Sequence, residues 1–152
     1  MRLHIIAVGK GRNAPEATLT SDWLSRLPAG GELNEVESKL PAGVARREDE
    51  AARILKLVPA DAALVAFDPK GRDCSSEELA QLLSLWQEEG RARACFAIGG
   101  ADGHGAAVLT RADKTLSFGR AIWPHMLFRA MVAEQLYRAN AILSGHPYHR
   151  PS

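Results

Sequence analysis

The stretch that decides the fold of this chain is Leu116–Tyr137, LSFGRAIWPHMLFRAMVAEQLY. It contains a short apolar strand, a glycine-containing bend, a Trp-Pro-His step and a long amphipathic helix. Pro124 disfavours helical conformation at Trp123 and fits the first turn of the helix that follows. The intervening segment, Gly119–Trp123, is too irregular for a strand and too apolar to lie in water, so we expect a buried loop. Buried backbone N–H and C=O groups need partners, and a bound ligand would supply them.

Working outward from this stretch, apolar strands alternate with helical patterns along the whole chain. Strands are predicted at Leu3–Val8, Glu32–Glu37, Ala62–Phe67, Ala94–Ile98 and Thr115–Phe118. Helices are predicted at Pro15–Leu27, at Glu48–Val58 with Ala52, Leu55 and Val58 on one face, between Ser75 and Gly90, around Ala106–Leu109, and after Pro124. Nearly continuous apolar strands are typical of parallel sheets covered on both faces. We therefore predict an α/β fold with a mainly parallel sheet and helices on both faces.

Length and composition indicate a single-domain protein without a disulfide scaffold or a membrane span. At 152 residues and 46% hydrophobic content, the chain is expected to form one domain, residues 1–152. Its two cysteines are far apart and form no CxxC or His-Cys cluster, which argues against a metal site and a disulfide scaffold and favours reduced thiols in the cytoplasm. The N-terminal apolar run is shorter than the roughly 7–15 residues of a signal core, and no run approaches the roughly 20 residues of a bilayer span. The net charge of +1 predicts no global attraction to nucleic acid.

Two predicted strand ends carry groups suited to a ligand. Asp68 follows a buried strand, and the carboxyl ends of parallel strands are where open α/β sheets bind ligands. Gly99, Gly100 and Gly103 follow another buried strand, which would let backbone amides approach a ligand closely, although a plain tight turn explains them about as well. The GGxxG turn is neither the dinucleotide fingerprint nor a phosphate loop, so no nucleoside triphosphate site is indicated.

Charged residues elsewhere have two interpretations each. The loop Lys39–Arg47 is expected to be solvated, with phosphate contact as the alternative. His125 opens the last helix either as a partner for free backbone donors or as a catalytic group. Glu134 and Arg138 have the spacing of an ion pair on a helix face. The ending His146–Arg150, HPYHR, can stack on a base and grip a phosphate, or can pack against the last helix.

Several stretches together resemble the RlmH (YbeA-like) family of SPOUT methyltransferases. They are MRLHIIAVGK, Ile98-Gly99-Gly100-x-x-Gly103, Leu116-Ser117-Phe118 with Pro124-His125 and Arg129, Glu134-Gln135-x-Tyr137-Arg138-Ala139, and His146-Pro147-Tyr148-His149-Arg150. Each is weak alone, but their order and spacing are specific, and the resemblance covers essentially the whole chain. The chain departs from the family pattern at Ala101, where Pro or Ser is common, and at Gly119 and Ile122, where hydroxyl residues are common.

The resemblance implies a fold, a cofactor and partners. The fold would be a SPOUT domain with a C-terminal trefoil knot, an exception to the usual rule against knots. Members of the family bind S-adenosyl-L-methionine in the knot as homodimers, and they methylate N3 of a pseudouridine in large-subunit (23S) ribosomal RNA. By position, the residues expected to bind the cofactor are Phe67, Asp68, Gly99, Gly100, Gly119, Arg120, Ala121, Ile122, Trp123 and Pro124.

The implied reaction is direct displacement of the sulfonium methyl group by N3, which must lose a proton. We predict His149 as the base, Tyr148 as a stacking or hydrogen-bonding group, and Arg150 as the group that stabilises the uracil anion or grips phosphate. The weak net charge favours a substrate recognised by shape in an assembled ribosome. In a dimer, the tail of one chain would reach the cofactor pocket of the other. Two alternatives stay open: an unknotted flavodoxin-like protein that binds a small molecule, and a non-enzymatic ribosome-associated module.

Overall fold

The computed structural model describes residues 1–150, in which five strands and five helices alternate as predicted. The strands are β1 (Arg2–Val8), β2 (Gly31–Val36), β3 (Ala63–Asp73), β4 (Arg93–Ile98) and β5 (Lys114–Ser117). The helices are α1 (Pro15–Ser25), α2 (Val44–Lys56), α3 (Ser76–Glu88), α4 (Ala106–Arg111) and α5 (His125–Ser144). None of these helices is long and apolar enough to cross a membrane.

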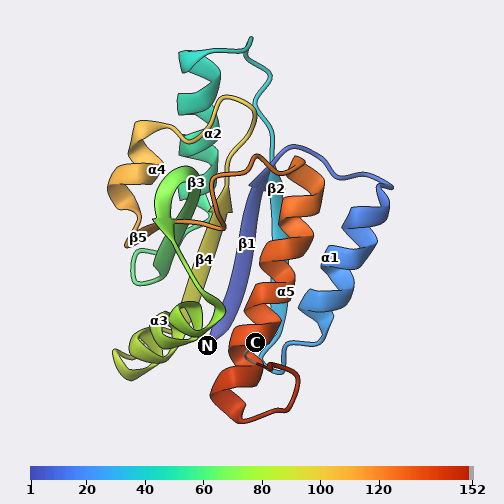
Figure 1. Cartoon of the computed structure of the whole chain (residues 1–152). Coiled ribbons are helices and arrows are strands. Elements are labelled where there is room, and N and C mark those ends of the chain that lie inside the picture. Colours follow the sequence, from blue (N-terminus) through green and yellow to red (C-terminus); the bar gives the residue numbers. More distant parts are fainter. Residues whose placement is uncertain (151–152) are drawn as a thin grey trace.

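The strands form one sheet in the order β2-β1-β4-β3-β5, and every neighbouring pair is parallel. Phe96, at the centre of β4, pairs with Ile5 on one side and Val65 on the other. Figure 1 shows helices in front of and behind this sheet. The predicted α/β architecture is therefore confirmed.

Alternating residues of the strands enter two separate cores. Ile5 packs with α1, α3 and α5 on one face of the sheet, whereas its neighbour Ile6 packs with α2 and α4 on the other. Both side chains are fully buried. Because successive strand side chains point to opposite faces, a strand covered on both faces must be apolar at consecutive positions. This explains the unbroken apolar run in β1.

The prediction for α2 was wrong in its start and in part of its buried face. The helix begins at Val44 instead of Glu48, so the end of the predicted loop is helical. Leu55 and Val58 pack against the core as predicted, but Ala52 is exposed. The fully buried residues of the helix are Glu50, Ala51 and Ile54. A charged residue on the core face misled a prediction that depends on hydrophobic spacing.

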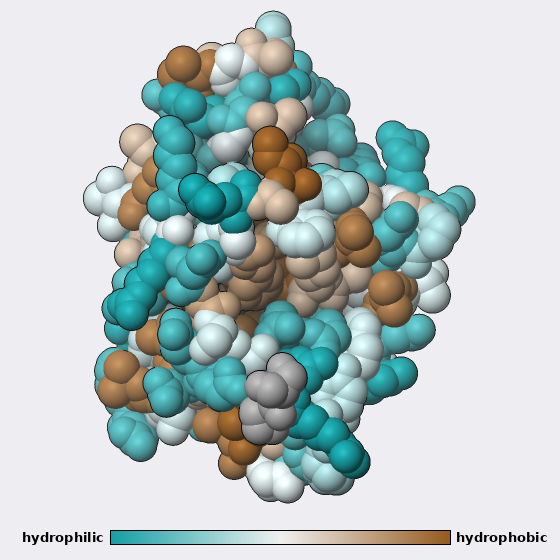
Figure 2. Space-filling model, viewed as in Figure 1, coloured by the Kyte–Doolittle hydropathy of each residue, from teal (hydrophilic) through white to brown (hydrophobic). Residues whose placement is uncertain are grey.

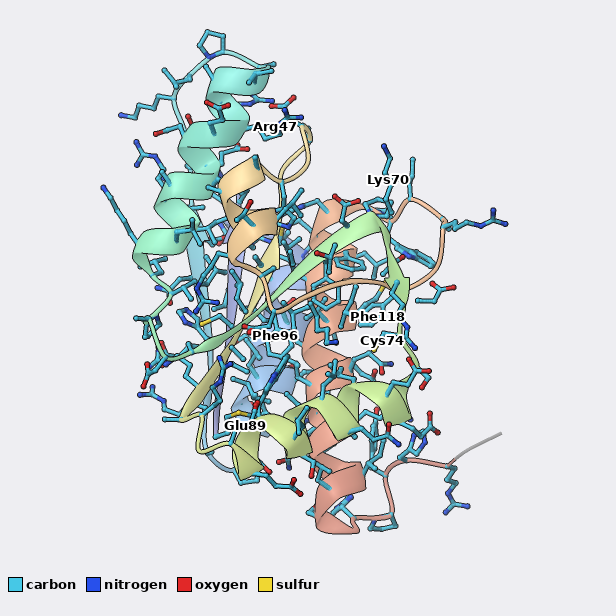
Figure 3. All side chains as sticks on the ribbon, turned by 90° about the vertical axis from the view of Figure 1, so that its left-hand side faces the viewer. Arg47, Lys70, Cys74, Glu89, Phe96 and Phe118 are labelled. Carbon is cyan, nitrogen blue, oxygen red and sulfur yellow. The ribbon has the colours of Figure 1, made fainter. Side chains whose placement is uncertain are left out.

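The predicted end of β3 at Phe67 was also wrong, because the strand continues to Asp73 after an irregularity. Phe67 and Arg72 both pair with Leu116 of β5, so the residues between them bulge over that strand. A Cβ atom at Gly71 would lie 2.7 Å from the carbonyl carbon of Leu116, which only glycine avoids. Lys70 projects away from the body of the protein at this crossing (Figure 3). The trefoil knot itself stays a prediction.

Candidate active site

A cavity of about 660 Å³ lies where the carboxyl ends of β1, β4 and β5 meet the bulge of β3. Its apolar part is a cluster of aromatic rings. The ring centroid of Phe118 lies 5.1 Å from that of Phe67 and 5.7 Å from that of Phe128, and Phe67 and Phe128 are 5.4 Å apart. All three residues line the cavity. This arrangement suits a flat apolar group.

The glycine turn after β4 forms another part of the cavity wall. Gly100 and Gly103 form an isolated bridge, and both line the cavity. A Cβ atom at Gly100 would lie 2.9 Å from Cγ1 of Val8 and 3.3 Å from Oε2 of Glu50. Glycine at this position therefore keeps the wall open, and brings the backbone and the Glu50 carboxyl to one corner.

Charged side chains lie at the corner of the cavity beside Gly100. Nε of Arg46 donates to Oδ2 of Asp102 at 2.8 Å, and this ion pair lowers the pKa of Asp102 below its ordinary value. Burial raises the pKa of Glu50, which has no such partner, above its ordinary value. Figure 3 shows Arg47, the neighbour of Arg46, near the start of α2 beside the loop that precedes α4.

The loop before α5 is exposed, contrary to the prediction of a buried loop. Ile122 is 91% exposed, and Trp123 is 40% exposed. Part of the loop backbone is satisfied by the protein itself, since the Gly119 N–H donates to Oδ1 of Asp73 at 2.9 Å. The indole N–H of Trp123 donates to the Phe118 carbonyl at 3.3 Å. Within a single chain, the loop is a rim of the cavity and not part of the core.

Most of the residues predicted to bind the cofactor lie around this cavity. Those in its lining are Phe67, Asp68, Gly99, Gly100, Gly119, Ala121, Ile122 and Trp123. Arg120 and Pro124 are not in the lining and are exposed. The lining also contains residues that sequence reasoning missed, such as Val8, Glu50 and His104. Val8 could have been found, because in the sequence it ends an unbroken apolar run, just as Phe67 does.

Arg129, which the family resemblance included without assigning it a role, ties α5 to the sheet. Its side chain is 1% exposed, and Nη2 donates to the carbonyls of Val8 at 3.1 Å and Gly9 at 2.9 Å. Nη1 donates to Oε2 of Glu35 at 2.5 Å, and Nε donates to Nε2 of His125 at 3.1 Å. Burial and the Arg129 guanidinium lower the pKa of His125. His125 thus accepts a hydrogen bond from the Arg129 side chain, whereas its expected role was to partner free backbone donors of the helix.

The three predicted catalytic residues do not reach the cavity in their own chain. They follow α5, whose 20 residues span about 30 Å and whose first turn lies at the cavity. The Tyr148 hydroxyl donates to Oε1 of Glu134 at 2.8 Å, and the Arg138 guanidinium carbon lies 4.8 Å from the centre of the Tyr148 ring. Glu134 and Arg138 form the expected ion pair. Arg150 is exposed.

Both ring nitrogens of His149 are engaged in this position. Nη1 of Arg138 lies 3.1 Å from Nδ1, and Oε1 of Glu77 lies 2.8 Å from Nε2. Arginine can only donate, so Nδ1 is the acceptor and the ring proton lies on Nε2. Of the two interpretations of the tail, the one in which it packs against the last helix therefore holds within a single chain.

A second groove, of about 740 Å³, lies between α1, α5 and the start of α3. Its apolar lining includes Leu19, Trp23, Leu127 and Met131, and it meets the first cavity at Phe118 and Gly119. Figure 2 shows a hollow floored by moderately hydrophobic residues over α5. Together with the exposed loop, this groove leaves apolar surface unpaired on one side of the molecule.

The chain is similar to known proteins over almost its whole length. Residues 1–149 match the family described as "Predicted SPOUT methyltransferase". A protein of Paramagnetospirillum magneticum named ribosomal RNA large subunit methyltransferase H is 52% identical over 152 residues, which cover 99% of this chain and 100% of the relative. A protein of the same name from Rhodospirillum rubrum is 48% identical, with 99% of each chain covered.

Among solved structures, the SpoU methyltransferase AviRb of Streptomyces viridochromogenes, crystallised with the cofactor AdoMet, is similar with a TM-score of 0.48 and 13% identity. The similarity covers 95% of this chain but spans only 61% of the length of AviRb. The family match and the close relatives cover this chain almost end to end, and on that basis the chain belongs to the SPOUT methyltransferase family.

Proposed function

We propose that this protein is an S-adenosylmethionine-dependent methyltransferase that modifies N3 of a pseudouridine in large-subunit (23S) ribosomal RNA. It would act in the cytoplasm, as a homodimer, on assembled ribosomes. One observation carries the proposal: a cavity at the carboxyl edge of the sheet gathers three sequence stretches that the family resemblance singled out. The near end-to-end identity with relatives named ribosomal RNA large subunit methyltransferase H supports the substrate class.

The residues of the cavity fit the proposed cofactor. A volume of about 660 Å³ lies within the range of roughly 300–1,000 Å³ typical of small-molecule sites. The Phe67, Phe118 and Phe128 rings offer a surface for an adenine, and the Gly99-Gly100 turn allows close approach of backbone groups. Glu50 adds a buried carboxyl oxygen that has no protein partner among residues 1–150. These features would hold a ligand that is apolar at one end and carries hydrogen-bond donors.

When bound, the cofactor supplies an electrophilic methyl group on a sulfonium. The contribution of the chain is to hold that group and the RNA base in line while water is excluded. His149 takes up the N3 proton, Tyr148 orients the base, and Arg150 stabilises the anion that develops on the uracil. In its own chain, His149 has its acceptor nitrogen engaged by Arg138, so it must leave this position to act as a base.

A homodimer resolves the separation between tail and cavity. Within one chain they lie at opposite ends of α5. The exposed apolar residues Ile122 and Trp123 on the cavity rim, with Leu19 and Leu127 in the adjoining groove, support pairing of two copies. We propose that the partner subunit supplies the tail to each cavity.

Mixing two inactive variants tests this division of labour. Gly100→Leu fills the cavity wall, and His149→Ala removes the base. If each cavity uses the tail of the partner, a heterodimer of the two variants has one intact site and regains about half of the wild-type activity per dimer. If each chain serves its own cavity, the mixture stays inactive.

Methyl transfer itself is tested with ribosomes from cells that lack this protein. Transfer of tritium from labelled S-adenosylmethionine to 23S ribosomal RNA, followed by mass mapping of the product, is expected to place one methyl group on a pseudouridine. Truncation after Gly145 is expected to abolish transfer while leaving cofactor binding largely intact by calorimetry. Absence of transfer to ribosomal RNA would contradict the proposed function.

A further inference from the structure

Among residues 1–150, Glu50 is the buried carboxyl that the packing of the fold does not explain. It lies on the sheet-facing side of α2 and is 6% exposed. Its Oε1 atom is buried and has no hydrogen-bond partner within residues 1–150. Burying an unpaired acid destabilises a protein, so such a group calls for a specific explanation.

The charged neighbours of Glu50 do not satisfy it. The Arg46 guanidinium, the cation that lowers the pKa of Glu50, donates instead to Asp102 at 2.8 Å. Asp49, the preceding acid, is engaged with Arg53 at 2.9 Å. Burial raises the pKa of Glu50, Asp102 and Asp49 add to the rise, and Arg46 opposes it. The carboxyl thus lies among two acids and one cation that is already paired.

The position of Glu50 at the cavity suggests what satisfies it. The side chain is part of the cavity lining, beside the glycine turn after β4. A Cβ atom at Gly100 would lie 3.3 Å from Oε2 and 3.4 Å from Oε1, so glycine keeps both oxygens clear of a neighbouring side chain. Rotation about the last side-chain bond of a glutamate is soft, and it exchanges the two oxygens. Either oxygen can therefore face a ligand in the cavity.

We propose that Glu50 is a cofactor-binding residue, whose carboxylate accepts a hydrogen bond from a donor group of S-adenosylmethionine. The donor is a ribose hydroxyl or the ammonium of the amino-acid part, both of which present N–H or O–H to an anion. The inference rests on the proposed function, because it assumes that this cofactor occupies the cavity. It assigns to α2 a role in binding that the family resemblance did not indicate.

The test compares Glu50→Met with Glu48→Met. Methionine has nearly the shape of glutamate but no acceptor, and Glu48 is an exposed acid on the same helix that does not line the cavity. Calorimetry with S-adenosylmethionine is expected to show an affinity loss of about ten-fold or more for Glu50→Met, and no loss for Glu48→Met. The melting temperature of unliganded Glu50→Met is expected to equal or exceed that of the wild type, because an unpaired buried acid is removed.

A second ligand identifies the donor. 5′-Methylthioadenosine retains the ribose hydroxyls and lacks the ammonium. If Glu50→Met weakens both ligands, the hydroxyls are the donor; if it weakens only S-adenosylmethionine, the ammonium is. Either result supports the proposal, whereas unchanged affinity for S-adenosylmethionine overturns it, whatever happens to the melting temperature.

A measurement on the wild-type protein keeps the proposal testable if Glu50→Met does not fold. The ¹³C resonance of the Glu50 carboxyl carbon is expected to move when S-adenosylmethionine saturates the site, while that of Glu48 stays in place. A Glu50 resonance that does not respond to bound cofactor overturns the proposal. If the wild type binds no S-adenosylmethionine at all, the proposed function itself fails, and that outcome is distinct from binding without a role for Glu50.

Discussion

Replacing Arg129 by methionine is the sharpest test of how this fold holds its cavity together. The guanidinium is 1% exposed and makes four hydrogen bonds, to Glu35, Val8, Gly9 and His125. Methionine keeps most of the buried apolar stem but leaves these acceptors without their donor. Breaking a buried ion pair from one side costs about 3–5 kcal/mol. Because Glu35 is 32% exposed and can recover water, we expect a loss near the lower end, about 3 kcal/mol.

The assay is urea unfolding, followed by circular dichroism, of the wild type, Arg129→Met and Arg53→Met. Arg53 forms an exposed i,i+4 pair with Asp49, so its removal is expected to cost much less stability than removal of Arg129. Addition of 1 M NaCl should erase the small Arg53 effect and leave the Arg129 effect nearly unchanged, since buried pairs are weakly screened. If the two variants lose equal stability, the reasoning that Arg129 locks α5 to the sheet is refuted.

Three further predictions follow from other contacts. Gly71→Val would drive a side chain into the Leu116 backbone, where a Cβ atom would lie 2.7 Å from the carbonyl carbon, and is expected to cost about 1–3 kcal/mol or more in thermal melts. Burial lowers the pKa of His104 below its ordinary value of 6.5, so as pH falls through that value the unfolded chain gains the proton first. Stability is therefore expected to fall below about pH 6.5, by at most about 1.4 kcal/mol per pH unit for this group, and His104→Gln should flatten the pH dependence of the urea midpoint. Burial raises the pKa of the Cys95 thiol to about 11, so in a Cys74→Ser background a disulfide reagent at pH 7.5 should label Cys95 only at the rate of unfolding; immediate labelling would contradict its burial.

The order of the elements could be predicted because it depends on local patterns. The apolar runs of β1, β3 and β4 are buried on both faces, and Ser75 caps α3 by accepting a bond from the Glu78 N–H, as the spacing suggested. These signals lie within a few residues of one another, so periodicity and capping chemistry detect them. The GGxxG turn was placed correctly at the end of a buried strand for the same reason.

The predictions from sequence failed mainly where a charged side chain is buried inside the fold. The fully buried part of the α2 face was missed because Glu50 lies on it. Arg129 was given no role because, apart from His125 four residues before it, its partners Glu35 and Gly9 are 94 and 120 residues away along the chain. The loop around Ile122 was expected to be buried because it is apolar, yet Ile122 is 91% exposed and nothing among residues 1–150 covers it.

The sequence by itself determined the parallel α/β architecture, the family, and the stretches that border the cavity. The periodicity of buried residues and the spacing of motifs are local properties of the sequence. Both can be read without knowing which distant residues are in contact. Only the tertiary structure decided that Glu50 is unpaired in the cavity, that Arg129 joins α5 to β1, and that His149 lies far from the cavity in its own chain. These facts depend on which polar atoms, distant in the sequence, come within hydrogen-bonding distance of one another. In a packed interior, those contacts are determined by the complete tertiary fold.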